Sequence, residues 1–151
     1  MSSKVRIVAR AVSVAGLAAL SAVHVIWASG SSWPAKSTER LAEAVVGQTV
    51  EMPGRLPTAV IAAGAAGAAG AACLVSGGLG ERGIARFGAR FTGTAMLLRA
   101  VLGGDVALAA LGLPPSSQTF RRLDRRYYRP FAALLGGALW IASSRDRKHG
   151  A

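Results

Sequence analysis

Four apolar stretches alternate with shorter polar and basic stretches along the chain, at about residues 8–28, 56–77, 87–104 and 127–144. The first two have about the 20 residues that an α-helix needs to cross a hydrocarbon core of about 30 Å. The third is weaker because Arg99 interrupts it, and the fourth is short unless residues 119–126 extend it. The pattern predicts an all-α fold, a bundle of four transmembrane helices in a single membrane domain, 1–151.

The first polar stretch contains the signals of a further, short helix. Ser37 is a residue type that caps a helix, Glu39 suits the first turn, and Gly47 can end it. Leu41 and Val45 give this helix a narrow apolar stripe. We therefore expect a short interfacial helix that lies on the bundle.

Composition favours the membrane interpretation. Hydrophobic residues make up 52% of the chain and charged residues 17%, with a mean hydropathy of +0.39. A soluble domain has about 25% charged residues. The alternative, one soluble helical domain, would have to bury four segments that are apolar on every face inside a small protein.

The net charge of +11 comes from 18 Lys and Arg against 7 Asp and Glu. The basic residues gather at the edges of the apolar stretches, where they set topology and contact anionic lipid headgroups. The chain has no zinc or helix-turn-helix pattern and no alternation of aromatic and basic residues on a strand. Nucleic acid is therefore not an expected partner.

The start of the chain decides the predicted orientation. Lys4, Arg6 and Arg10 precede the first apolar stretch, whereas all the basic residues outside the spans, these three included, divide almost evenly between the two sides. The sequence thus predicts a multi-pass protein of the cell membrane with both termini in the cytoplasm. A secretory signal has a similar pattern, but His24 and Trp27 lie near its end, where a signal peptide has small, uncharged residues. Their presence favours a first helix that is retained in the mature protein.

The second apolar stretch is rich in glycine and alanine. Gly64, Gly67 and Gly70 form part of small-xxx-small pairs, which let membrane helices approach closely. We predict these glycines to be helix-packing residues. The alternative is a glycine- and alanine-rich composition without a specific interface.

Arg99 is the charged residue that lies well inside a predicted span. An arginine there costs about 2.5–3.5 kcal/mol on insertion scales, so it needs a partner or water. Asp124, just before the fourth span, is the first candidate; Asp105 is six residues from Arg99 and out of helical phase. With His24 and Trp27 at the end of the first helix, these residues predict a polar cluster at the outer rim.

That cluster has two interpretations. In the structural one, an Arg99–Asp124 ion pair ties the third helix to the fourth and His24 hydrogen-bonds a neighbour. In the functional one, a pocket lined by these residues opens outward for a small polar or lipid-like ligand, or for proton transfer.

A second basic group precedes and begins the fourth span. Five arginines alternate there with Phe120, Leu123 and Tyr127, a pattern that suits a membrane interface. They are the candidate lipid-binding residues: Arg121, Arg122, Arg125, Arg126 and Arg129. The alternative is a solvated basic loop.

Catalytic and metal motifs are missing from the sequence. The two histidines, His24 and His149, are far apart, and Cys73 is the lone cysteine, so we expect no metal site and no cofactor. The favoured hypothesis is a structural, accessory or lipid-interacting membrane protein. The alternatives are a ligand or ion pathway and a small membrane enzyme that uses His24 as acid and base. Expected partners are membrane lipids, anionic ones included, and a second copy or a larger membrane complex.

Four sequence patches, in order and spacing across the chain, resemble one known family: residues 24–33 (HVIWASGSSW), 98–105 (LRAVLGGD), 119–124 (TFRRLD) and 128–130 (YRP). The resemblance is to the uncharacterised family of small bacterial four-helix membrane proteins called domain of unknown function 3995. The sequence departs from that pattern at Ser31, where a second glycine is common, and at Phe131, where leucine is usual. The resemblance implies a four-helix integral membrane protein and no particular activity.

Overall fold

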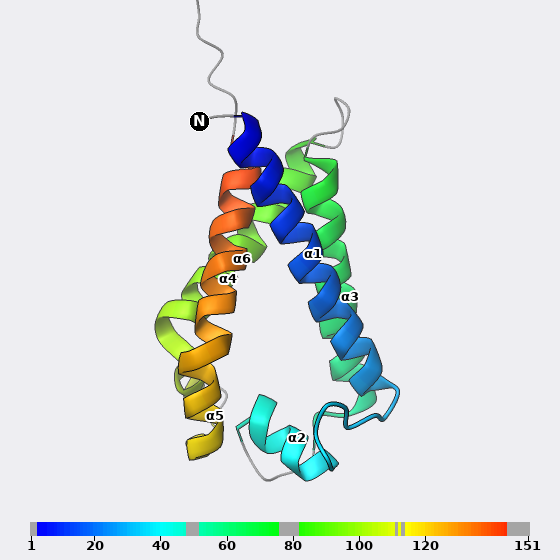
Figure 1. The fold of residues 1–151 in the computed structure, drawn as a ribbon, viewed down its shortest axis with the longest axis vertical. Coiled ribbons are helices and arrows are strands. Elements are labelled where there is room, and N and C mark those ends of the chain that lie inside the picture. Colours follow the sequence, from blue (N-terminus) through cyan, green and yellow to red (C-terminus); the bar gives the residue numbers. More distant parts are fainter. Residues whose placement is uncertain (1–2, 48–51, 76–81, 111, 113, 145–151) are drawn as a thin grey trace, which may run out of the picture.

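The computed structural model describes residues 3–47, 52–75, 82–110, 112 and 114–144, and these residues fold into helices without a β-strand (Figure 1). The prediction of an all-α fold is therefore confirmed. The elements in chain order are α1 (Ser3–Ala28), α2 (Thr38–Val45), α3 (Arg55–Leu74), α4 (Arg82–Ala110), α5 (Gln118–Leu123), the π-helix η1 (Asp124–Tyr128) and α6 (Arg129–Ala142).

The long helices form two pairs. α1 packs along α3 and α4 packs along α6, and the pairs are joined mainly through α1 and α6. Figure 1 shows the pairs close together at the end near the N-terminus and diverging toward α2 and α5. Leu17, Leu135 and Leu139 are fully buried where the pairs meet, among alanines that allow close approach of the backbones.

Alanines, not glycines, form the packing face of α3. Ala62, Ala65, Ala68, Ala69 and Ala72 are buried. The predicted packing glycines, Gly64, Gly67 and Gly70, are exposed, and a Cβ added at each would meet no atom within 4 Å. At about 100° per residue the glycines fall on the opposite face of the helix from these alanines. The prediction that these glycines pack against another helix is therefore wrong for helices of this chain.

Two helices among the described residues, α1 and α3, are long and apolar enough to cross a membrane. α4 has 29 residues, but its arginines lower its hydropathy. α6 has only 14 residues, although α5, η1 and α6 follow one another without a gap from Gln118 to Ala142. At 1.5 Å per residue that helical run is about 37 Å long, so the predicted extension of the fourth segment through residues 119–126 is present.

The short helix predicted after the first span is also present, as α2. The Ser37 hydroxyl accepts a hydrogen bond from the Arg40 N–H, and Gly47 ends the segment with a φ of +88°. Leu41 is buried. A hydrogen bond joins the end of this segment to the other half of the chain: the Gly47 carbonyl accepts from the Ser117 N–H at 2.7 Å.

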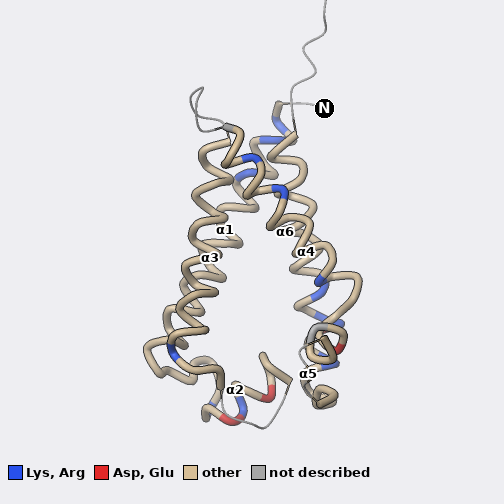
Figure 2. Tube along the Cα trace, turned by 180° about the vertical axis from the view of Figure 1, so that it is seen from behind, with Lys and Arg blue, Asp and Glu red and all other residues tan. Residues whose placement is uncertain are grey.

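Charge is distributed unevenly along the bundle. Figure 2 shows Lys and Arg at both ends, whereas the acidic residues drawn lie at the end with α2 and α5. Both carboxylates of the predicted polar cluster, Asp105 and Asp124, belong to this end.

Candidate functional site

α4 is interrupted at Gly103. This residue has φ 78° and ψ 177°, a backbone conformation that only glycine adopts without strain. The helix resumes at once and continues to Ala110. A break of this kind leaves carbonyl groups unbonded before it and N–H groups unbonded after it, so neighbouring side chains must bind them.

Asp124 binds the N–H side of the break. Its Oδ2 accepts a hydrogen bond from the Gly104 N–H at 3.1 Å. Its Oδ1 accepts from Arg99 Nη2 at 2.5 Å. The carboxylate is almost fully buried and the Arg99 side chain is 30% exposed. The pairing of Arg99 with Asp124 that the sequence favoured is thus present, with the Gly104 backbone as a further partner that the sequence did not indicate.

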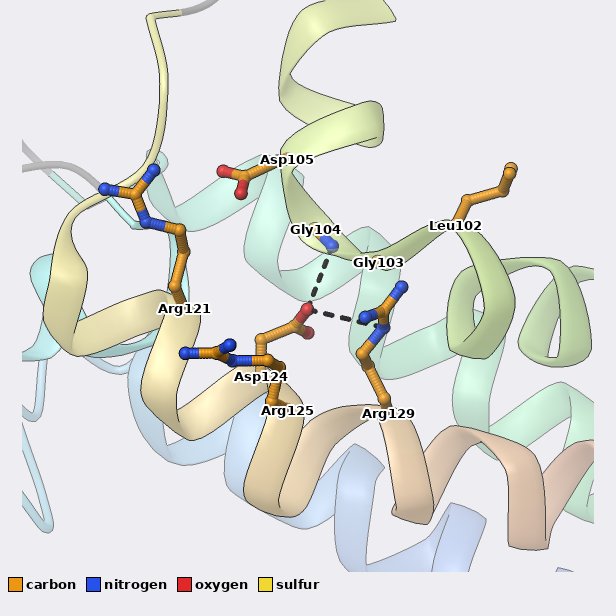
Figure 3. A pocket seen from close by; sticks show the side chains of 8 residues that line it. All are labelled: Leu102, Gly103, Gly104, Asp105, Arg121, Asp124, Arg125 and Arg129. Atoms are coloured by element: carbon orange, nitrogen blue, oxygen red, sulfur yellow. Dashed lines mark hydrogen bonds and ion pairs between the residues drawn. The ribbon is translucent and has the colours of Figure 1, made fainter.

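Arg129 binds the carbonyl side of the break. Its Nε donates to the Ala100 oxygen at 3.0 Å and its Nη2 to the Val101 oxygen at 2.5 Å. Its Nε also lies 3.9 Å from Asp124 Oδ2. We call Arg99, Asp124 and Arg129 the break cluster. Figure 3 shows Asp124 and Arg129 side by side under Gly103 and Gly104, where together they satisfy both sides of the interruption.

The π-helix η1 explains how one helical run supplies both residues. In a regular helix, positions five apart point in directions about 140° apart. η1 has wider turns, in which the Arg129 N–H donates to the Asp124 carbonyl five residues earlier. The wider turn brings Asp124 and Arg129 toward the same side. No pattern in the sequence indicates this turn, so the role of Arg129 at the break does not follow from the sequence.

Next to the break is an open cavity of about 250 Å³, which we call the break cavity. Figure 3 shows the Arg121 and Asp105 side chains beside it. Its lining residues come from α4 and from the run α5–η1–α6: Leu102, Gly103, Gly104, Asp105, Arg121, Asp124, Arg125 and Arg129.

Asp105 is held by the loop before α5. Its Oδ1 accepts hydrogen bonds from the Ser116 hydroxyl and from the Ser116 N–H, the latter at 3.2 Å. Asp105 therefore holds the loop before α5, and among the described residues it makes no ion pair with Arg99.

His24 and Trp27 do not join this cluster, which corrects the five-residue prediction. His24 Nδ1 lies 2.8 Å from the Leu20 oxygen, and Trp27 Nε1 donates to the Trp33 oxygen at 2.7 Å. Among the described residues, no hydrogen bond or ion pair connects either side chain to Arg99. The physical reason is the divergence of α1 from α6 toward this end (Figure 1).

The arginine-rich stretch divides into two environments. Arg129 belongs to the break cluster, whereas Arg121, Arg122, Arg125 and Arg126 are exposed. Arg126 lies over the Tyr127 ring at 5.6 Å. Within the described ranges, no three His, Cys, Asp or Glu side chains gather as metal ligands would.

These observations define an all-α protein with two helices of membrane-spanning length and composition and a charged cluster at a helix break. Residues 17–139 match the family model described as protein of unknown function (DUF3995), and the chain belongs to that family. The match includes every residue of the break cluster and of the break cavity. No curated protein and no solved structure shows significant similarity to the chain.

Proposed function

We propose that this chain is a multi-pass membrane protein with four crossings and both termini in the cytoplasm. α1 and α3 are two of the crossings, and α4 and the run α5–η1–α6 are the others. Large hydrophobic side chains support this proposal, because they are exposed on all four: Val8 on α1, Val60 on α3, Phe91 on α4 and Leu134 on α6. An apolar surface of this extent suits lipid better than water.

The function that we propose is a structural or accessory one, in which the α5–η1 end of the bundle binds anionic lipid headgroups. The observation that carries it is the set of four exposed arginines, Arg121, Arg122, Arg125 and Arg126, on one short helical run next to the exposed Tyr127 ring. Basic residues near an anionic membrane surface contribute about 1 kcal/mol each. The pathway and enzyme hypotheses have less support, because His24 lies apart from the break cluster.

Reporter fusions test the four crossings and their orientation. Fusions after Ser32 and Ser116 should give an outward signal, and fusions after Gly80 and Ala151 a cytoplasmic one, because the basic start of the chain keeps the N-terminus inside. Alkaline phosphatase and green fluorescent protein activities, read for each position, give the measurement. An outward signal at Gly80 would reverse the orientation. Equal signals at Gly80 and Ser116 would remove the third crossing.

Lipid composition tests the basic end. We expect the purified protein to retain phosphatidylglycerol over phosphatidylcholine in mixed nanodiscs, and to lose this preference when all four exposed arginines become glutamine. Added salt should weaken the preference too, because exposed charges are screened within about 8–10 Å at physiological ionic strength.

A matched control removes basic residues elsewhere at the same end. Lys36, Arg40 and Arg55 are exposed and lie outside the α5–η1 run. Their replacement by glutamine should reduce the preference much less than the four arginine changes. An unchanged preference in the four-arginine variant, measured by mass spectrometry of the retained lipids, would contradict the proposal.

A further inference from the structure

The break cavity has polar groups that the break cluster does not use. Asp124 is already bonded to Arg99 and to the Gly104 N–H, and Asp105 is bonded to Ser116. Arg121 and Arg125 are exposed, and neither guanidinium donates a hydrogen bond to any residue that the structure describes. The cavity wall therefore includes two guanidinium groups whose N–H donors are available to a ligand.

The charges around the cavity do not cancel. Arg99 and Asp124 neutralise each other, which leaves Arg121, Arg125 and Arg129 against the one carboxylate of Asp105. The excess is two positive charges. A planar guanidinium presents its N–H groups as a fork that matches the oxygens of phosphate, and two such forks on one side suit a group with several oxygens.

The spacing of the two free arginines supports one shared ligand. Arg121 and Arg125 are four residues apart on the α5–η1 run, a separation that places side chains on the same helical face. Both line the break cavity, whose volume of about 250 Å³ is enough for a small tetrahedral anion. Arg122 and Arg126 belong to the same run and do not line it.

We propose that the break cavity is a saturable binding site for one phosphate group, which Arg121 and Arg125 bind directly and Arg129 attracts. The group is either the phosphate of a lipid headgroup or free inorganic phosphate. The site rests on the proposed function, since it gives the basic end of the bundle one defined site in addition to its general attraction for anionic lipid.

The test compares two double variants of the full-length protein in a neutral detergent. Arg121→Gln with Arg125→Gln removes two cavity arginines, and Arg122→Gln with Arg126→Gln removes the same charge from the same run outside the cavity. The probes are inorganic phosphate and dihexanoyl phosphatidic acid, titrated by isothermal calorimetry with chloride held constant. Thermal unfolding of each variant confirms that it is folded.

We expect saturable binding with one site per chain. The cavity variant should weaken it by about tenfold or more, because each lost charge-assisted pair removes a strong hydrogen bond. The outer variant should weaken it by no more than about twofold, as screened charges at longer range would. Arg121→Lys with Arg125→Lys, which keeps charge and loses the fork, should fall between these results.

The outcomes separate the possibilities. Binding of the phosphatidic acid alone assigns the site to a lipid headgroup, and binding of both probes assigns it to phosphate itself. Equal weakening by the two double variants, or no saturable binding of either probe, overturns the site. If the nanodisc preference for anionic lipid then persists, the proposed function stands without the site; if that preference is also lacking, both fail.

Discussion

Asp124→Leu should lower the free energy of unfolding by about 2–4 kcal/mol, because the change leaves Arg99 and Arg129 without their carboxylate inside a partly dry site. The value is below the range for a fully buried pair because the Arg99 side chain is 30% exposed. The Gly104 N–H also loses its acceptor. Arg99→Leu should cost less, since Asp124 keeps its hydrogen bond to Gly104 and the nearby charge of Arg129.

A double-mutant cycle measures the interaction itself. The variant with both leucines should recover about 1–2 kcal/mol of the summed single losses. Thermal or denaturant unfolding in detergent supplies the four values, and Arg122→Leu, an exposed arginine outside the break, should stay within about 0.5 kcal/mol of the native protein. Additive losses would show that Arg99 and Asp124 do not stabilise each other, and would favour a water-filled pocket around Arg99.

Gly103→Ala should also cost about 2–4 kcal/mol. The backbone conformation at Gly103 alone costs other residues about 1–3 kcal/mol. In addition, a Cβ there would lie 2.9 Å from Arg129 Nη2, so the guanidinium must move away from the carbonyl groups that it binds. The measurement is the same unfolding experiment.

Gly64→Ala is the matched control for this prediction. Gly64 is exposed within α3, and an added Cβ would meet no atom within 4 Å. The substitution should be neutral or stabilising by up to about 1 kcal/mol, because alanine favours a helix interior. Equal effects of the two substitutions would mean that α4 is continuous through Gly103.

Local rules explain why much of the fold was predictable. The cap at Ser37 and the glycine at Gly47 define α2 through groups that are close in sequence. Likewise, an arginine in an apolar helix is costly without a partner, so the sequence singles out Arg99 as a residue that needs one. Asp124 is the carboxylate at a suitable depth on the neighbouring helix. Depth along a helix follows from counting residues, and that is sufficient for this pair.

Lateral position does not follow from counting residues, and the wrong predictions have this cause. His24 has a suitable depth but lies on a helix that diverges from α6 (Figure 1). The sequence also does not determine which face of α3 packs against its neighbours, since alanines and glycines both permit close approach. The residues that begin and follow η1, Asp124 and Arg129, bind backbone groups of Ala100, Val101 and Gly104 on α4. These partners are distant in sequence, so no local pattern predicts the π-turn.

The wide turn of η1 makes the number of residues in this segment as important as their chemistry. Removing one residue from it would restore a regular helix and rotate everything before it by about 100° relative to α6. Arg129 and the core leucines of α6 would keep their places, while Asp124 would turn away from Gly104. A relative with one residue fewer in this turn must therefore have an α4 without the break, or bind the N–H groups at the break with a carboxylate from another position.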